Sequence, residues 1–293
     1  MSSPKPFVLP VADSKSTFVP DLFKGKVLFC TGGRSGICYK IVETMMTHGV
    51  SAAIVGRDAK GLQESADTLS KTTGGKCIPA SADVRDPDQI QAAVKKTVDE
   101  FGRIDFVICA GAAGNFLAPI SGLSERAFAT VVQIDLLGTY NTIRATIPHL
   151  RKSRGAYVHI SATLHYKGMP YQAHVSAAKA GVDALSQVLA AEEGPRGVRS
   201  NVIAPGPIGN TEGMSRLTPK GFDPVNGIPL GRQGASSDIA NAAVYLFSPA
   251  ASWVTGTVTV VDGGEQHIRQ LSLAYPQSIL DPDSIKSLIK PKL

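Results

Sequence analysis

Seven short apolar runs alternate with longer segments of helical periodicity between residues 26 and 264. The runs are almost continuously apolar, as expected of strands that helices cover on both faces. Regular alternation of strand and helix favours right-handed crossovers, and it predicts one parallel, doubly wound seven-stranded α/β sheet. The expected strands are 26–31, 52–56, 76–83, 104–110, 155–161, 200–206 and 257–263. The expected helices lie near 36–49, 59–71, 87–101, 124–150, 171–193 and 236–247.

Composition limits the classes of function. The chain has 293 residues, of which 43% are hydrophobic and 18% charged, which fits one large α/β domain. The net charge of +6 is spread along the chain without a basic run, so a nucleic-acid tail is not expected, whereas anionic small ligands are favoured. The four cysteines lie in or beside apolar runs without C-x-x-C spacing, which predicts reduced, buried thiols and no metal site.

The two ends and one internal stretch fall outside the alternating pattern. Residues 1–21 are rich in proline and predict an extended arm, not a secretory signal, ahead of a domain at 22–264. Residues 207–236 lack a clear period and follow a strand, which favours a mobile substrate lid; a disordered insertion is the alternative. The tail 265–293 ends in Pro-Lys-Leu, close to the Ser-Lys-Leu peroxisomal address. No apolar run approaches the roughly 18 residues of a membrane span.

A glycine-rich turn, TGGRSGIC at 31–38, lies between the first strand and the first helix. Glycines there let the backbone approach a pyrophosphate, whose charge the amides and dipole of the helix N-terminus stabilise. Where a further glycine is common, this chain has Cys38, a small residue that still permits close packing. The turn therefore predicts a dinucleotide site formed by Gly32, Gly33, Arg34, Ser35, Gly36 and Ile37.

The residues at the tip of the second strand indicate whether NAD(H) or NADP(H) binds. An acidic residue there would bind a ribose 2′-hydroxyl, whereas a basic residue would pair with a 2′-phosphate. Arg57 occupies this tip, Asp58 follows it, and Arg34 lies in the glycine turn. Two guanidiniums at one corner favour NADP(H) over NAD(H). The alternative is that Asp58 binds the ribose and Arg57 is a solvated surface charge.

Several motifs coincide in order along the chain: TGGRSGI, then ADV at 82–84, CAGAAGN at 109–115, HVSAAKAG around Lys179, IAPGPIGNTEG at 203–213 and VTGTVTVVDGG at 254–264. Together they resemble the short-chain dehydrogenase/reductase family over about residues 22–264. The resemblance implies a Rossmann fold with NADP(H) along the carboxyl ends of the strands. It places Asp83 and Val84 at the adenine and Lys179 at the nicotinamide ribose. Further cofactor contacts are expected from Ala110, Gly111, Pro205, Gly206, Ile208 and Thr211.

The catalytic set of that family is only partly present. A tyrosine usually lies four residues before the lysine and a serine thirteen residues before the tyrosine; these positions hold Val175 and Ala162 here. The asparagine common on the long middle helix is replaced by Asp135, in VVQIDLLGTYN. Tyrosine protonates an alkoxide and serine polarises a carbonyl, so alcohol–ketone chemistry loses both groups.

One branch of the family lacks the same pair. The segments AAGNFLAP, QIDLLGTYN, SATLHYKG and HVSAAKAGVDAL resemble the peroxisomal 2,4-dienoyl-CoA reductases, in which Asp135 and Lys179 would be the catalytic pair. The resemblance implies NADPH-dependent reduction of 2,4-dienoyl-CoA to 3-enoyl-CoA in β-oxidation of unsaturated fatty acids. It also implies an acyl-CoA substrate, a peroxisomal location reached through the Pro-Lys-Leu end and its import receptor, and a homotetramer.

This chemistry needs no phenol, because the dienolate that follows hydride addition is protonated on carbon. We expect a relay of Asp135, water and Lys179 to supply the proton; the alternative is that Asp135 only anchors Lys179. Asn115, Phe116 and His174 are the expected substrate contacts, although a structural role suits His174 equally well. Two other functions stay open: a carbonyl reductase that uses Tyr166 or Tyr171 as donor, and a catalytically silent NADPH-binding scaffold.

Overall fold

A seven-stranded parallel sheet runs through the centre of the molecule, with its strands in the order β3-β2-β1-β4-β5-β6-β7. The computed structural model describes residues 8–111, 114, 116–218, 221–268, 276, 280–281 and 283. The strands are β1 (Val27–Thr31), β2 (Ser51–Gly56), β3 (Cys77–Ser81), β4 (Phe106–Cys109), β5 (Ala156–Ile160), β6 (Arg199–Pro205) and β7 (Val258–Val261). The predicted single α/β domain with a parallel, doubly wound sheet is confirmed.

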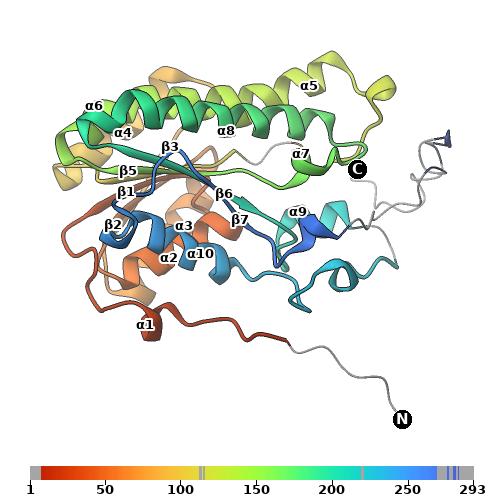
Figure 1. Ribbon diagram of the computed structural model, residues 1–293. Helices are drawn as coiled ribbons and strands as arrows, with labels where there is room; N and C mark the ends of the chain where they lie inside the picture. Colours follow the sequence, from red (N-terminus) through yellow and green to blue (C-terminus); the bar gives the residue numbers. More distant parts are fainter. Residues whose placement is uncertain are drawn as a thin grey trace, which may run out of the picture.

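Helices cover both faces of the sheet (Figure 1). The α-helices are α1 (Ser14–Thr17), α2 (Gly36–Thr47), α3 (Ala59–Thr73), α4 (Pro87–Phe101), α5 (Glu125–Val132), α6 (Gly138–Ser153), α7 (Leu164–Lys167), α8 (Ala173–Glu193), α9 (Glu212–Leu217) and α10 (Ser236–Phe247). Shorter helical turns are η1 (Ile120–Gly122), η2 (Gln133–Leu137), η3 (Gly194–Arg196), η4 (Pro224–Gly227), η5 (Pro249–Ala251) and η6 (Glu265–His267). Helices α2, α3 and α10 lie on one face, and α4, α6 and α8 on the other.

Local sequence signals set the ends of these helices. Asp58 caps α3 by accepting a hydrogen bond from the Gly61 amide at 3.1 Å. Asp86 caps α4 in the same way, with Pro87 in the first turn. Gly74 and Gly102 end these helices in the left-handed conformation, with φ of 73° and 76°. These caps explain why the predicted boundaries of α3 and α4 agree closely with the structure.

Two apolar clusters, one on each face, form the core. Leu28, Ile41, Ile54 and Val244 belong to the cluster beneath α2 and α10. Phe29, Val107 and Leu150 belong to the cluster on the other face. Adjacent strand residues such as Leu28 and Phe29 point to opposite faces, and both are fully buried. Burial on both faces accounts for the continuous apolar runs in the sequence.

The structure departs from the predicted elements at three places. The single helix expected over 124–150 is divided into α5 and α6 by η2, a turn of π-helix at Gln133–Leu137. The short helix α7 precedes α8 where a loop was expected, and α9 and η4 lie within the predicted irregular stretch 207–236. In the arm, one helical turn (α1) interrupts the extended chain.

The N-terminal arm is held against the body of the protein near α10. The Arg232 guanidinium donates to the carbonyl oxygen of Leu9 at 2.8 Å, and the Asn241 amide donates to the carbonyl oxygen of Ala12 at 3.0 Å. Figure 1 shows α1 on the α2 and α10 side of the sheet. Within the described part of the chain, no helix combines the length and apolar character that crossing a bilayer requires.

Candidate active site

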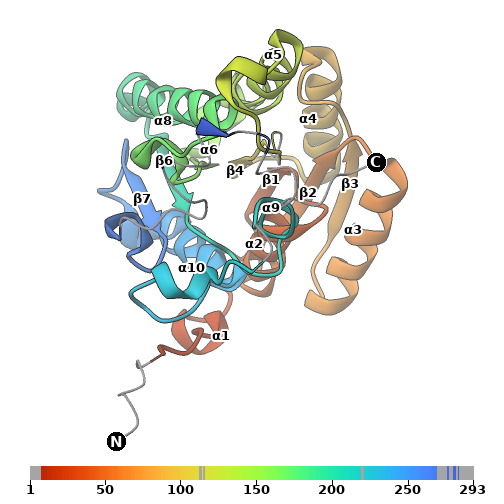
Figure 2. The same ribbon diagram turned by 90° about the vertical axis from the view of Figure 1, so that its right-hand side faces the viewer.

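A cavity of about 460 Å³ lies at the carboxyl ends of the central strands. The segments that follow β1, β4, β5 and β6 line it together with α9, which Figure 2 shows in front of the sheet. The strand order reverses between β1 and β4, which is where open α/β sheets bind their ligands. The residues predicted to hold a dinucleotide that line the cavity are Gly32, Ser35, Gly36, Ile37, Ala110, Gly111, Lys179, Pro205, Gly206, Ile208 and Thr211.

The glycine turn has the backbone geometry that close approach of a phosphate requires. Gly32 and Gly36 have φ of 71° and 60°, in the left-handed region that side chains disfavour. Helix α2 begins at Gly36, so its first amides face the cavity. Position 33 requires a glycine for a different reason: a Cβ there would lie 2.6 Å from the Ile54 side chain. The turn therefore fits a pyrophosphate, with Gly33 serving the packing against β2.

The corner at the end of β2 brings Arg34 and Asp58 together. The Arg34 guanidinium lies 3.5 Å from the Asp58 carboxylate, and that carboxylate also caps α3. Arg57 is exposed beside them. Since Asp58 is engaged by two groups of the protein itself, it is less suited to a ribose hydroxyl than a free carboxylate would be. The described wall of the cavity includes neither arginine, so the two guanidiniums lie beyond the glycine turn.

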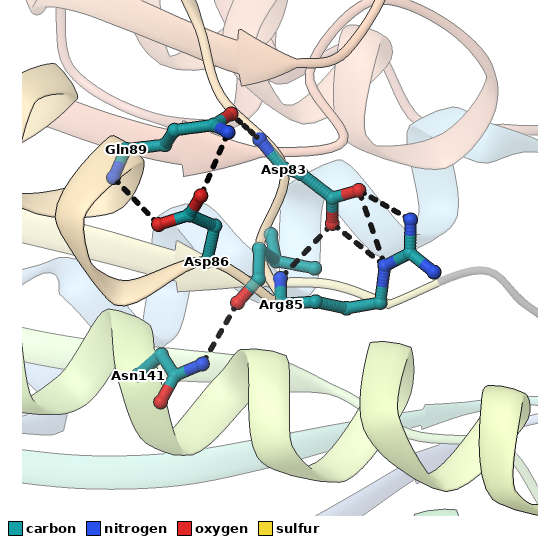
Figure 3. Close-up of polar contacts among 6 residues, drawn as sticks. Asp83, Arg85, Asp86, Gln89 and Asn141 are labelled. Carbon is teal, nitrogen blue, oxygen red and sulfur yellow. Dashed lines mark hydrogen bonds and ion pairs between the residues drawn. The ribbon is translucent and has the colours of Figure 1, made fainter.

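The loop after β3 is fixed by a network of hydrogen bonds (Figure 3). Arg85 forms a bidentate pair with the Asp83 carboxylate, and this guanidinium lowers the pKa of Asp83 to about 2. The Gln89 side chain accepts from the Asp83 amide at 2.9 Å. Asn141 on α6 donates to the Val84 carbonyl at 3.0 Å. Asp83 and Val84 are thus held in one conformation, but the adenine contact expected of them stays a prediction.

Asp135 and Lys179 meet at the wall of the cavity. The Lys179 ammonium lies 3.4 Å from the Asp135 carboxylate. It also donates to the carbonyl oxygens of Gly111 at 2.9 Å and Ile160 at 3.0 Å, which follow β4 and end β5. Asp135 is fully buried and Lys179 is 6% exposed. The structure thus brings together the two residues predicted to be catalytic, and it places a cation and a carboxyl group beside the predicted cofactor site.

Two local features allow Asp135 to lie close to Lys179 and to the segment after β4. Asp135 lies in the π-helical turn η2, which widens the helix at this point. Gly111 lies against that turn, and a Cβ on it would be 2.5 Å from the Asp135 Cα atom. A glycine at 111 is therefore required for η2 and the segment after β4 to lie this close, and no sequence pattern indicates that contact.

The positions that would hold a tyrosine and a serine donor are apolar in three dimensions as well. Val175 and Ala162 both line the cavity, and Val175 packs with Val131 and Ala178. Further apolar residues extend the wall on this side: Leu117, Leu164, Met169, Pro170, Met214, Leu217 and Phe222. The arrangement offers a long unsaturated or aliphatic chain a path beside Asp135 and Lys179.

Of the two tyrosines that could replace the lost donor, Tyr166 is hydrogen-bonded to another residue and Tyr171 is buried. The Tyr166 hydroxyl donates to the Asp183 carboxylate at 2.8 Å, as does the His165 imidazole at 2.7 Å. Burial and this contact raise the pKa of Tyr166. Tyr171 is 7% exposed in a left-handed conformation with φ of 67°. The described wall of the cavity includes neither tyrosine.

Of the three predicted substrate contacts, two can be placed. His174 is fully buried, stacks on Phe116 with ring centroids 4.2 Å apart, and lies 3.2 Å from the Gly114 carbonyl oxygen. Burial lowers the pKa of His174, so its ring is neutral near pH 7. Phe116 is 38% exposed, and Asn115 lies outside the described residues. Neither His174 nor Phe116 is among the described residues that line the cavity.

The two ends of the stretch 207–236 are joined at a paired base, and several of its described residues line the cavity. Ile208 pairs with Gly234, and the Gly209 amide donates to the Gly234 carbonyl at 2.9 Å. Thr211 caps α9 and also donates to the Ile208 carbonyl at 2.8 Å. Sequence reasoning missed several polar residues that line the cavity: Thr163, Lys167, Gln172, Glu212 and Glu265. Lys167 and Glu265 form an ion pair at 2.5 Å between α7 and η6, which no spacing in the sequence indicates.

Comparisons with known proteins agree with this geometry. The family model described as enoyl-(acyl carrier protein) reductase matches residues 32–266. A peroxisomal, (3E)-enoyl-CoA-producing 2,4-dienoyl-CoA reductase of Saccharomyces cerevisiae is 52% identical over 260 residues, covering 87% of this chain and 89% of the relative. The corresponding Rattus norvegicus protein is 47% identical over 252 residues, covering 84% and 86%. A solved short-chain type dehydrogenase/reductase of Mycobacterium ulcerans superposes with a TM-score of 0.78 at 28% identity, covering 91% and 99%.

The contact between Gly111 and Asp135 can be tested by adding one methyl group. We expect Gly111→Ala to lower the free energy of unfolding by about 1–3 kcal/mol, because overpacking forces the π turn away from β4. Urea denaturation measures this change. Gly194→Ala is the matched control, since a Cβ at Gly194 would meet no atom within 4 Å. Equal stability of the two variants would show that the π turn yields without cost.

Proposed function

The chain belongs to the short-chain dehydrogenase/reductase family, and from this premise we propose that it reduces 2,4-dienoyl-CoA to 3-enoyl-CoA with NADPH. Membership implies a nicotinamide dinucleotide as cofactor. One observation carries the choice of substrate: the cavity retains a buried carboxyl group and an ammonium, Asp135 and Lys179, beside apolar side chains where the phenol and hydroxyl donors would be. The printed names of the relatives from yeast and rat support the same reaction.

The chemistry suits the residues present. NADPH, when bound, supplies a hydride to the far carbon of the diene. The negative charge then moves along the conjugated system to the thioester oxygen, and the dienolate is protonated on carbon. No alkoxide forms at the carbon that accepts the hydride, so a phenol beside it has no proton to deliver. Asp135 holds the proton and passes it through one water, and Lys179 orients that water and the ribose.

The preference for NADPH rests on charge at the β2 corner. Arg34 and Arg57 provide two guanidiniums near the place where a 2′-phosphate would lie. Asp58 neutralises part of this charge, but its carboxylate is turned to Arg34 and the α3 amides. A doubly charged phosphate gains more from two guanidiniums than a ribose hydroxyl does.

The remaining parts of the proposal concern the substrate contacts, the cellular location and the assembly of the enzyme. The segment 207–236 acts as a substrate lid. Asn115 and Phe116 contact the substrate, and the His174 ring, which stacks on Phe116, holds Phe116 in place. The Pro-Lys-Leu end is bound by the peroxisomal import receptor, although these three residues lie outside the described chain. The names of the relatives support a peroxisomal location and an acyl-CoA substrate. We also propose that the protein assembles as a homotetramer.

Mixing the purified protein with NADPH and 2,4-hexadienoyl-CoA tests the reaction directly. We expect rapid loss of both the NADPH and the diene absorbance, with a 3-enoyl-CoA as product. Oxidation of NADPH by ketones alone would instead support a carbonyl reductase that uses Tyr166 or Tyr171. Binding of NADPH without oxidation by either class of substrate would mean a silent scaffold. Both of these last results would contradict the proposal.

The role of Asp135 is tested by Asp135→Asn, which keeps the size of the side chain and removes its acidic proton. We expect kcat to fall by about 10²–10⁴-fold, the range that general acid catalysis contributes, while the Kd for NADPH changes little. Steady-state kinetics and a fluorescence titration measure the two quantities. Asp99→Asn, at an exposed carboxylate on α4, is the control. If Asp135 only anchored Lys179, the variant would lose cofactor affinity and keep most of its kcat.

The cofactor preference is tested by Arg57→Gln. Loss of one guanidinium should lower kcat/KM for NADPH about tenfold or more, because a charge-assisted hydrogen bond is lost, and should leave kcat/KM for NADH nearly unchanged. Kinetics with both cofactors at fixed dienoyl-CoA measure the ratio. An unaltered preference for NADPH would show that Arg57 is a solvated surface charge.

A further inference from the structure

Gln172 is a buried polar residue of the cavity to which the mechanism gives no task. It lies directly before α8, is 1% exposed, and lines the cavity together with Val175. Its side-chain amide donates from Nε2 to the carbonyl oxygen of Phe116 at 3.1 Å. Its Oε1 atom is buried and has no hydrogen-bond partner among the residues that the structure describes.

The orientation of this amide follows from its partner. A carbonyl oxygen accepts hydrogen bonds and cannot donate them, so the NH₂ group must face Phe116 and Oε1 must face the other way. Buried acceptors in folded proteins nearly always find a donor, either in the protein or in a bound molecule. Gln172 is a lining residue of the cavity, so we take its unmatched Oε1 to await a donor that arrives with the ligand.

The position of Gln172 identifies which donor this is, given the proposed dienoyl-CoA substrate. Gln172 precedes Lys179 by seven residues, which corresponds to roughly 10 Å along a helix. In a 2,4-dienoyl thioester of pantetheine, eight bonds separate the carbon that accepts the hydride from the nearest amide nitrogen of the arm. An extended chain of that length spans roughly 10 Å. A substrate whose diene lies near Lys179 can therefore place this N–H near Gln172.

We propose that Gln172 Oε1 accepts a hydrogen bond from the pantetheine amide N–H nearest the thioester. Gln172 is then a substrate-binding residue that fixes the thioester end, while its Nε2 group holds the loop at Phe116 in place. Val175, one turn further along α8, leaves the arm room to pass where a tyrosine would stand. The inference rests on the proposed function for the identity of the substrate.

Two small thioesters separate this contact from any other effect. The N-acetylcysteamine thioester of 2,4-hexadienoic acid carries the amide N–H in the same place as coenzyme A. The S-(4-oxopentyl) thioester replaces that N–H by CH₂ and keeps the neighbouring carbonyl. We expect the wild-type protein to favour the first by about tenfold in kcat/KM, the worth of one buried hydrogen bond. Loss of diene absorbance gives the rate for both, since a ketone could also consume NADPH.

The variant Gln172→Met should bring this ratio close to one. Gln133→Met, the same exchange at an exposed position of η2, should retain the wild-type ratio. A Gln172→Met protein that loses rate equally on both thioesters, so that the ratio is kept, would overturn the proposal, since Gln172 would then act only on the loop. A wild-type ratio near one would overturn it as well.

The same comparison can be made without turnover. Calorimetry gives the Kd of the two matching saturated hexanoyl thioesters, which cannot be reduced. The wild-type protein should bind the amide-bearing thioester about tenfold more tightly, and Gln172→Met should lose the difference. If the wild-type protein does not reduce 2,4-hexadienoyl-CoA, the proposed reaction fails, while these affinities still decide whether Gln172 binds the amide.

Discussion

The anchoring of Lys179 is the interaction on which the site depends. One ammonium is held by the Gly111 carbonyl after β4, the Ile160 carbonyl at the end of β5 and the Asp135 carboxylate in the π turn. Two strands and two helices are thereby tied together at a point with almost no access to solvent. A buried ammonium is tolerated only where such acceptors are present, because desolvation of an unpaired charge is very costly. The close approach of Gly111 to Asp135 makes this arrangement possible.

The loss of the family's tyrosine and serine changes which groups face the pocket, and neither Tyr166 nor Tyr171 is among the described residues that line it. Tyr166 donates to Asp183, whose pKa is raised by burial but lowered overall by the hydrogen bonds it accepts. That contact fastens α7 to α8 and so shapes the wall that carries Leu164 and Lys167. The Tyr166 hydroxyl thus serves the shape of this wall, whereas the carboxyl–ammonium pair of Asp135 and Lys179 lies at the cavity itself.

Most of the fold could be predicted from the sequence. Strands that are buried on both faces of the sheet appear in the sequence as continuous apolar runs, and aspartate caps and C-terminal glycines mark the ends of helices such as α3 and α4. The pairing of Asp135 with Lys179 was also accessible, through the resemblance to a family. The π turn was not, and the glycine that lies against it, Gly111, is more than twenty residues away in the sequence. Nor was Gln172, because its significance lies in an oxygen atom left without a partner, and a sequence records residue types, not satisfied hydrogen bonds.

The base of the stretch 207–236 holds the two ends of this stretch together and ties them to the rest of the fold. Ile208 and Gly234 close the stretch at its root, and Arg232, which holds both Asp238 and the arm at Leu9, fastens that root to α10. The described part of the chain between residues 209 and 233 therefore extends from a root that is held on both sides, and it includes Thr211, one of the predicted cofactor contacts. Since α9 and Phe222 from this stretch supply apolar wall to the cavity, a change of their side chains would, under the proposed function, alter the space that is offered to the acyl chain.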